Sequence, residues 1–541
     1  MKPINKSPVD PHYDFIVVGA GTAGCTLANR LTASGRHSVL MIEAGGLDNW
    51  IWFRIPVGYL YAINNPRADW CYRTEAEAGL NGRSLIYPRG KVVGGCSSIN
   101  GMIYMRGQAA DYDNWAALGN PGWSWNEVLP YFIKSEDRNG APDAFHGKGG
   151  EWHVENMRHR WKVLELFRDA AAEHGIPPVD DFNRGDNEGM GYFEVNQRRG
   201  VRLSTAGAFL RPALRRPNFT LWTEAQATRL VCENGRAVAL ELLHNGERKT
   251  IRSKREVILA AGAVNTPQLL QLSGIGDGSF LQHMGIPVIH HLPGVGENLQ
   301  DHLQLRTIFG VENLATLNSS ANSLWGKAHM ALLYALFRRG PMTMAPSQMG
   351  GFTRSSPNQK TPNLQFHVQP LSLNKFGEPL HKYPAFTATA CNLRPESRGH
   401  VRIKSADPLQ APAIQPNYLS TDADRKIAVD AITLLRRIVL QSNALAPHKP
   451  RELKPGPEVS SEADLLHAAG DIGTTIFHPV GTCRMGQGEM AVVDSELKLR
   501  GVTGLRVVDA SIMPAITSGN TNSPTIMIAE KAAGLILKTA S

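Results

Sequence analysis

Residues 15–24 read Phe-Ile-Val-Val-Gly-Ala-Gly-Thr-Ala-Gly, so that an apolar run passes directly into three closely spaced glycines. A second apolar run, 39–42, ends at Glu43, which stands 19 residues after Gly24. Strand, glycine turn, helix, strand and acid in this order are typical of a βαβ unit that binds a dinucleotide. We therefore expect a dinucleotide at this end of the chain, although a glycine-rich turn without a ligand has the same local pattern.

The chemistry of a dinucleotide explains why these residue types are needed. Glycines at 19, 21 and 24 allow a tight strand-to-helix turn, and they let the backbone approach a pyrophosphate at the positive end of the helix that begins near Thr22. Glu43 would accept hydrogen bonds from the adenosine ribose and would repel a 2′-phosphate. The site therefore suits FAD or NAD rather than NADP.

Length, composition and charge describe a large globular protein. A chain of 541 residues exceeds what one hydrophobic core usually organises, so we expect two domains or one core with an inserted second layer. The net charge of +9 is spread along the chain without long basic runs, which argues against nucleic acid as a partner. A basic surface is compatible with anionic substrates, with an acidic membrane face, or simply with a soluble protein.

Cysteine usage and hydropathy indicate the compartment. The six cysteines stand far apart, with no CxxC pair and no Cys/His spacing typical of zinc, so we expect reduced thiols, no bound metal and a cytoplasmic protein. Residues 1–13 are polar, and no stretch approaches the ~20 apolar residues that span a bilayer. The apolar segment 328–339 has basic ends and fits a core helix or a helix that dips into a membrane, so peripheral contact with the inner membrane stays open.

The apolar runs predict an α/β fold in two parts. We expect a Rossmann-like cofactor-binding domain made of residues 1–160, 215–312 and 470–541, and a substrate-binding domain made of 161–214 and 313–469. The second domain is expected to be an antiparallel sheet backed by helices. The predicted strands are 15–18, 39–42, 219–222, 237–243, 256–262, 364–368, 385–390 and 505–510, and the predicted helices are 163–174, 327–338, 421–441 and 523–537.

Three further blocks carry residue types suited to a bound ligand. Small residues in 90–100 are expected where backbone passes close to a bulky group. The block 262–276 follows a buried-strand pattern, and its Pro267 suits the first turn of a short helix. Near the C-terminus, 478–486 reads His-Pro-Val-Gly-Thr-Cys-Arg-Met-Gly. The segment 509–522 follows, with Asp509 at its start and Asn520 and Asn522 at its end.

In combination with 19–43, these blocks resemble the glucose-methanol-choline (GMC) family of FAD-dependent oxidoreductases. The resemblance covers nearly the whole chain, 13–537, and is weakest over 313–462. It implies that FAD is the cofactor. Some choline-oxidising relatives attach the flavin through a histidine just before the asparagine of the second block, whereas this chain has Ile99 there, so we expect FAD to be held without a covalent bond.

The resemblance also implies which residues hold FAD. By this resemblance, the residues that meet the ADP half are Gly19, Gly21, Thr22, Ala23, Gly24 and Glu43. The residues that lie against the flavin are Val93, Asn100, Gly101 and Met102. Asp509 and Ala510 meet the ribityl and pyrophosphate part, and Thr521 and Asn522 lie near the flavin edge.

The expected catalytic residues are His478 and Asn520. An alkoxide expels hydride far more readily than a neutral alcohol, so a base is needed, and the resemblance implies that His478 lies in front of the flavin. Asn520 would bind the same oxygen and stabilise its developing charge. Asn520 and Asn522 would alternatively cap the helix that Ser523 and Pro524 begin.

The expected reaction is oxidation of a primary alcohol to an aldehyde, with proton abstraction, hydride transfer to flavin N5, and electrons passed to a quinone-type or other acceptor. An oxidase that uses O₂ and gives H₂O₂, and a non-redox enzyme similar to hydroxynitrile lyases, stay open as alternatives. Choline also stays open as a substrate, since Glu312 and the aromatic side chains of Trp325, Tyr334 and Phe337 are suitable partners for a quaternary ammonium.

Overall fold

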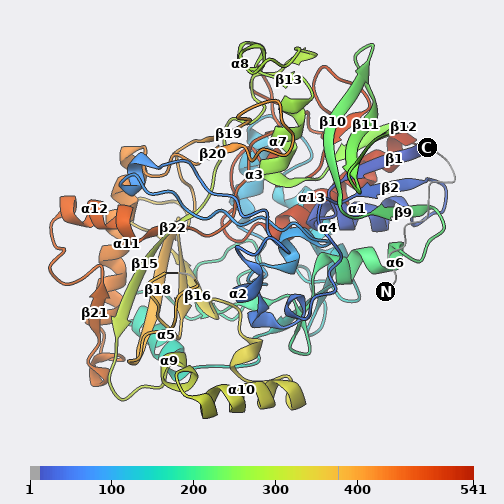
Figure 1. Ribbon diagram of the computed structural model, residues 1–541. Helices are drawn as coiled ribbons and strands as arrows, with labels where there is room; N and C mark the ends of the chain where they lie inside the picture. The colour runs from blue at the N-terminus through green and yellow to red at the C-terminus, as the bar shows by residue number, and fades with distance from the viewer. Residues whose placement is uncertain (1–11, 376, 541) are drawn as a thin grey trace.

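The computed structural model describes residues 12–375 and 377–540, which contain two seven-stranded sheets, one on each side of the view in Figure 1. The first sheet combines parallel and antiparallel pairs, and the second is antiparallel throughout. In spatial order the first sheet consists of β10 (Ala225–Glu233), β11 (Arg236–His244), β12 (Glu247–Leu259), β1 (His12–Val18), β2 (Val39–Ile42) and β9 (Phe219–Trp222), with β23 (Leu505–Val507) beside β12.

The predicted βαβ unit forms the centre of the first sheet. β1 runs parallel to both β2 and β12, and α1 (Thr22–Leu31) connects β1 to β2. The turn requires glycine: Gly19 has a φ of +102°, and a Cβ at this position would lie 2.5 Å from the carbonyl oxygen of Ala260. A Cβ on Gly24 would lie 1.9 Å from the carbonyl oxygen of Gly19, so this glycine permits close packing of α1 on the strand turn.

The C-terminal segment returns to the same sheet. β23 pairs with β12 in parallel, and α13 (Asn522–Ala540) packs along α1. Arg30 of α1 lies 2.6 Å from the carboxylate of Glu530 of α13, which is buried, and also 2.6 Å from Glu151. The first and last elements of the described residues, β1 and α13, therefore belong to one unit (Figure 1).

The second sheet lies against a layer of helices. Its order is β21 (Arg451–Lys454), β15 (Leu303–Gly310), β18 (Ala385–Asn392), β17 (Leu364–Gln369), β16 (Met349–Thr353) and β5 (Gly189–Tyr192), with β22 (Gly473–Thr475) also paired to β15. The helices that pack against it are α5 (Lys162–Glu173), α11 (Asp422–Leu440) and α12 (Glu462–Ile472). The expected fold class, a Rossmann-like domain plus an antiparallel sheet backed by helices, is confirmed.

The sheets depart from the expected division of the chain at two strands. β15 lies before 312 and β22 after 470, yet both belong to the second sheet, where β15 lies between β18 and the edge strands β21 and β22. An apolar strand at a junction has the same pattern in either sheet, so its hydrogen-bonding partners decide its place. The two-domain division itself stays a prediction.

The predicted position of Pro267 is wrong. α7 spans Gly262–Leu272, which places Pro267 inside the helix rather than in its first turn. Proline has no N–H to donate to the carbonyl oxygen of Ala263, but the hydroxyl of Thr482 donates to that oxygen at 2.7 Å. A tertiary hydrogen bond therefore replaces the one that proline removes.

The remaining elements connect the two sheets or lie at the edges. α10 (Leu324–Phe337) lies at the edge of the molecule, away from both sheets (Figure 1). The others are η1 (Ile51–Phe53), η2 (Pro56–Gly58), α2 (Tyr59–Ala62), η3 (Ala78–Leu80), η4 (Gly95–Ser98), α3 (Ala109–Ala117), α4 (Trp125–Ser135), β3 (Glu136–Arg138), β4 (Trp152–Asn156), β6 (Glu194–Val195), β7 (Gln197–Arg198), β8 (Val201–Arg202), η5 (Ala206–Leu210), α6 (Arg211–Ala213), β13 (Ile275–Gly276), α8 (Gly278–His283), β14 (His290–His291), α9 (Leu317–Ala321), η6 (Pro341–Thr343), β19 (His400–Arg402), β20 (Ala413–Gln415), η7 (Ala446–His448) and η8 (Ala510–Ile512).

Candidate active site

A cavity of about 1290 Å³ extends from the glycine turn of the first sheet to the face of the second. Its volume exceeds the 300 to 1,000 Å³ that is usual for a small ligand, so a dinucleotide and a substrate fit together. Most residues predicted from the sequence to form the site line this cavity. They are Gly19, Gly21, Thr22, Ala23, Glu43, Asn100, Gly101, Met102, His478, Asp509, Ala510, Asn520, Thr521 and Asn522.

Gly24 and Val93 are the exceptions, since neither lines the cavity. Gly24 lies behind the turn, where it packs against Gly19. Val93 is 2% exposed, belongs to the core of the first sheet and donates its N–H to the carbonyl oxygen of Gly46. Both positions support the wall of the cavity through packing.

The glycine turn fits the pyrophosphate of a dinucleotide. A Cβ on Gly21 would find no atom closer than 4.0 Å, so the space in front of this residue is open where the turn faces the cavity. Glu43 lies at the end of β2, and its carboxylate accepts from the N–H groups of Ala20 at 2.9 Å and Gly45 at 2.7 Å. Burial raises the pKa of Glu43 to about 7. These contacts hold the acid at the cavity wall, with lone pairs left for ribose hydroxyls.

The C-terminal residues close the cavity from the other side. Asp509 accepts from the N–H of Gly262 at 2.9 Å and from the hydroxyl of Thr266 at 2.6 Å, and burial raises its pKa. The hydroxyl of Thr22 donates to Oδ1 of Asn522 at 2.7 Å, a contact between the starts of α1 and α13. Nδ2 of Asn522 has no hydrogen-bond partner among the described residues, so it is free to bind a ligand atom.

The segment around Asn100 is held by buried polar contacts. Met102 has a φ of +65°, and its N–H donates to Oδ1 of Asn100 at 3.0 Å. The same oxygen accepts from the guanidinium of Arg202 at 3.0 Å, and burial lowers the pKa of Arg202 to about 9. The strained backbone and its supporting arginine fix the part of the cavity wall expected to lie against a flavin.

His478 and Asn520 meet at the wall of the cavity. Nε2 of His478 lies 3.0 Å from Nδ2 of Asn520. The backbone N–H of His478 donates to Asp301 at 2.8 Å, and the same carboxylate accepts from the hydroxyls of Thr475 at 2.6 Å and Tyr418 at 2.5 Å. The structure thus brings the two predicted catalytic residues together and adds a buried aspartate that holds the histidine backbone.

His302, which immediately precedes β15, determines the tautomer of His478. Its Nε2 lies 3.1 Å from the carbonyl oxygen of Leu393, which only accepts, so Nε2 of His302 carries a proton. Nδ1 of the neutral ring is then an acceptor, and it lies 3.1 Å from Nδ1 of His478, which must donate. Nε2 of His478 is consequently the unprotonated nitrogen, and it accepts from Asn520. One carbonyl therefore leaves a basic lone pair at the cavity wall.

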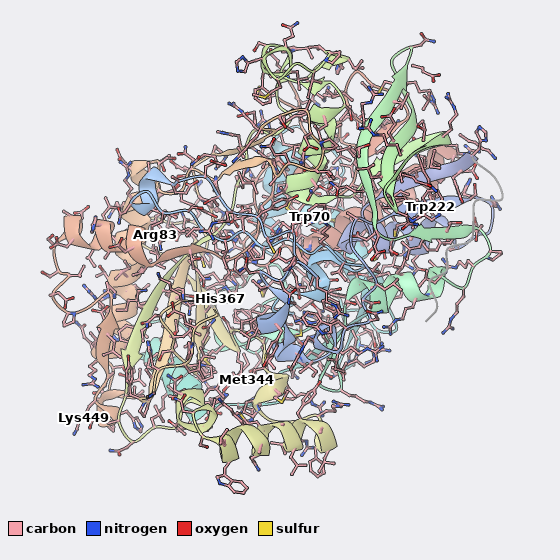
Figure 2. The ribbon with its side chains drawn as sticks, viewed as in Figure 1. Trp70, Arg83, Trp222, Met344, His367 and Lys449 are labelled. Carbon is pink, nitrogen blue, oxygen red and sulfur yellow. The ribbon has the colours of Figure 1, made fainter. Side chains whose placement is uncertain are left out.

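All three buried imidazoles in this region are held neutral. Burial lowers the pKa of His478 well below 6.5, and neighbouring imidazoles lower it further. Burial likewise lowers the pKa of His302 to about 4 and that of His367 on β17 to about 3. His367 also lines the cavity, and Figure 2 shows it in the interior of the molecule. A neutral base is the form that accepts a proton.

The residues that left choline open do not form a site. Glu312 is exposed and pairs with Lys449 at 3.0 Å, and Trp325 and Phe337 are 88% and 62% exposed. Tyr334 is buried and donates its hydroxyl to the carbonyl oxygen of Gly200. None of these four residues lines the cavity, so they provide no cage for a quaternary ammonium.

Sequence reasoning missed His302, Asp301 and His367. Asp301 and His302 immediately precede an apolar strand, and a charged or titratable pair at such a position is a signal of a buried polar cluster. The contact itself is hidden from the sequence, because His302 and His478 are 176 positions apart.

Comparison with known proteins is consistent with this architecture. Two models described as GMC oxidoreductase match residues 13–304 and 395–529. The chain is 41% identical to the "Alcohol dehydrogenase [acceptor]" of Pseudomonas putida, over 97% of this chain and 96% of the relative. It is 41% identical to the "Oxygen-dependent choline dehydrogenase" of Vibrio vulnificus, over 97% of this chain and 94% of the relative. The structure of an FAD-dependent oxidoreductase from Chaetomium thermophilum superposes with a TM-score of 0.90 at 28% identity, covering 98% and 99% of the two chains.

Proposed function

The chain belongs to the GMC oxidoreductase family and is an FAD-dependent enzyme acting on CH–OH donors, and from this premise we propose that it oxidises a primary alcohol to the aldehyde. His478 serves as the base and Asn520 as the donor to the substrate oxygen. The observation that carries the proposal is the hydrogen-bond chain through His302, which leaves Nε2 of His478 unprotonated.

The proposed step divides the substrate hydrogens between two acceptors. Nε2 of His478 takes the hydroxyl proton, and the resulting charge on oxygen favours departure of hydride from the adjacent carbon. FAD, when bound, supplies the acceptor for that hydride at N5. The amide of Asn520 has a second N–H to donate to the oxygen, an effect worth roughly 2.7 to 4 kcal/mol for one well-placed donor.

FAD is proposed to be held without a covalent bond. The buried side chain at position 99 is isoleucine, which offers no nucleophile to the flavin. The residues proposed to hold the cofactor are the predicted ones that line the cavity, with Gly21 and Glu43 at the ADP end and Asn522 near the flavin edge. Release of intact FAD by heat denaturation tests this proposal, and a yellow protein pellet would contradict it.

Anaerobic mixing with a panel of alcohols, followed by flavin absorbance, tests the reaction class. A primary alcohol should bleach the flavin in the wild-type enzyme and in the control variant His467→Gln, whose side chain is 72% exposed. Substrate that turns over without bleaching would instead favour a non-redox enzyme. Subsequent addition of air or of a quinone analogue separates an oxidase from a dehydrogenase, and we propose a quinone-type acceptor.

The surface of α10 supports a lipid-soluble acceptor and peripheral contact with a membrane. Tyr334 is its only buried residue, whereas Leu324 and Trp325 are 84% and 88% exposed. The stretch 313–375 contains no Asp or Glu but contains six basic residues, which suits an anionic bilayer. These basic residues are Lys327, Arg338, Arg339, Arg354, Lys360 and Lys375. Lys327 also lines the cavity, so the cavity extends to α10. No helix of the described segments is long and apolar enough to cross a bilayer.

Vesicle sedimentation tests the membrane contact. The enzyme should sediment with phosphatidylglycerol-containing vesicles and should be released when Trp325 and Leu332 are both replaced by serine. The control Ile289→Ser, a change at an exposed apolar residue outside α10, should leave sedimentation unchanged. Equal sedimentation of the double variant and the wild type would contradict the proposal.

A further inference from the structure

Two of the basic side chains that line the cavity stand on strands of the second sheet and form no ion pair with a described residue. Arg306 stands on β15 and Lys454 on β21, and both belong to the cavity wall. Over the described residues, neither side chain forms an ion pair or a hydrogen bond. Most other arginines in the interior have carboxylate or carbonyl partners, as Arg106 has in Glu136 at 2.7 Å. The two cavity cations are therefore left for a ligand.

The register of the sheet places these cations on the face that carries the site. Ile308 of β15 pairs with Lys454, and Arg306, two residues earlier, points to the same side as Ile308. Arg306 also lies in line with Thr389 and His367 across the neighbouring strands, and His367 lines the cavity. Lys454 and Arg306 are thus diagonal neighbours, about 7 to 8 Å apart at the backbone.

Arg306 lies on β15, which begins directly after the residue that positions the base. His302 lies four residues before Arg306, about 13 Å along the strand at 3.3 to 3.4 Å per residue. A substrate whose hydroxyl lies at His478 can therefore place its other end at Arg306. The two cations therefore lie where they are able to contact a substrate group far from the reacting carbon.

Burial makes these cations costly without a counter-charge. Burial lowers the pKa of Arg306, and it lowers that of Lys454, to which Arg306, Arg83 and Lys375 add further repulsion. Asp471 opposes this effect on Lys454, but the two side chains form no ion pair, so the compensation is only partial.

Two other groups near these cations do not neutralise them. Glu378 lines the cavity from an exposed loop and forms no ion pair within the described ranges. Tyr59 lies near Arg306 and is a neutral phenol whose pKa burial raises. Uncompensated positive charge in a closed site is stabilised by a bound anion and opposes a bound cation.

We propose that Arg306, together with Lys454, forms a subsite for a carboxylate at the far end of the alcohol substrate. The planar guanidinium presents paired N–H donors that match the two oxygens of a carboxylate. The enzyme then acts on hydroxycarboxylic acids in preference to neutral alcohols and to quaternary ammonium alcohols. This inference rests on the proposed function for the chemistry of the hydroxyl end, but not for binding of the carboxylate.

Matched substrates test the subsite in the holoenzyme. The ratio of kcat/KM for 6-hydroxyhexanoate to that for hexane-1,6-diol, and the same ratio for longer pairs, measures the preference for a carboxylate. Arg306→Gln should lower this ratio about 10- to 100-fold, the loss expected for a charge-assisted hydrogen bond. Arg306→Lys, which keeps the charge, should retain part of the preference. An unchanged ratio in Arg306→Gln would overturn the proposal.

A charge-matched control separates local binding from net charge. Lys449 lies on the same side of the molecule but is 73% exposed and pairs with Glu312, and Figure 2 shows it at the periphery. Lys449→Gln removes one positive charge and should leave the ratio at the wild-type value. A fall as large as that of Arg306→Gln would mean that long-range attraction causes the preference, and it would overturn the subsite.

A binding measurement distinguishes the subsite from the proposed reaction. Hexanoate has no hydroxyl to oxidise, and calorimetry on the holoenzyme should show binding that weakens at least tenfold in Arg306→Gln. If alcohols bleach the flavin but hexanoate binds both proteins equally, the subsite is wrong and the reaction stands. If hexanoate binding depends on Arg306 but no alcohol bleaches the flavin, the subsite stands and the proposed reaction is wrong.

Discussion

Replacing His302 by leucine tests how the base is prepared. The change removes two hydrogen-bonding groups: the acceptor for Nδ1–H of His478 and the donor to the carbonyl oxygen of Leu393, both at 3.1 Å. Position 302 is fully buried, and leucine fills it with an apolar side chain of similar volume. A buried donor left without a partner costs about 1 to 3 kcal/mol. The tautomer of His478 with its proton on Nε2 then becomes more stable. In this tautomer, Nε2 has no lone pair to accept the proton of the alcohol.

The size of the effect follows from that energy. Since about 1.4 kcal/mol corresponds to a factor of ten, we expect the rate constant of flavin reduction to fall about 10- to 100-fold in His302→Leu. Anaerobic stopped-flow absorbance at saturating alcohol measures this rate without a contribution from the electron acceptor. His302→Gln, whose amide oxygen is able to accept from Nδ1–H, should recover part of the rate.

Two readouts separate positioning from a loss of structure. Thermal melting should show that His302→Leu is folded. The pH dependence of the rate constant of flavin reduction should also change, because the protonation of His478 changes. The control His467→Gln should behave as the wild type. Reduction at the wild-type rate with an unaltered pH profile in His302→Leu would refute the tautomer argument.

Three further predictions follow from the same geometry. Gly21→Val should lower the FAD content of the purified protein, because its side chain would fill the open space at the glycine turn; full flavin absorbance would contradict this assignment. The kcat/KM for a neutral alcohol should stay level from about pH 8 to pH 6 and fall only below that, since burial lowers the pKa of His478 below 6.5 and the neutral ring is the active form; a titration near pH 7 would count against it. The free energy of unfolding should decrease as the pH falls below 6.5, because the unfolded imidazoles take up protons before the folded ones, whose pKa values are about 4 for His302 and about 3 for His367. From pH 6.5 to pH 5 each contributes about 2 kcal/mol, and urea titrations of His367→Phe should show a smaller decrease than the wild type.

The sequence predicts those parts of the molecule that depend on neighbouring residues. The glycine turn, α1 and the acid at the end of β2 follow from one short pattern, because each feature is specified within a few residues. His478 and Asn520 could be proposed because their blocks resemble a known family, and the structure brings them within 3.0 Å. Their chemical roles stay predictions.

The features that the sequence does not predict depend on the pairing of distant strands. His302 and Arg306 acquire their roles from the register of β15 with its neighbours, and a strand pattern alone does not specify which strand lies beside it. Pro267 shows the same limit in a helix, because the hydroxyl that accommodates it comes from Thr482, far along the chain. β15 shows the limit again, since its membership of the second sheet depends on pairing with strands far along the chain.

The central claim is that the neutral imidazole of His478 removes the proton of an alcohol in a cavity that holds FAD. The most direct measurement is the anaerobic rate of flavin reduction by a primary alcohol in His478→Ala that has been purified with its FAD. We expect a decrease of about 10²- to 10⁴-fold relative to the wild type, the usual contribution of a general base. Reduction of the flavin at the wild-type rate in this variant would contradict the account.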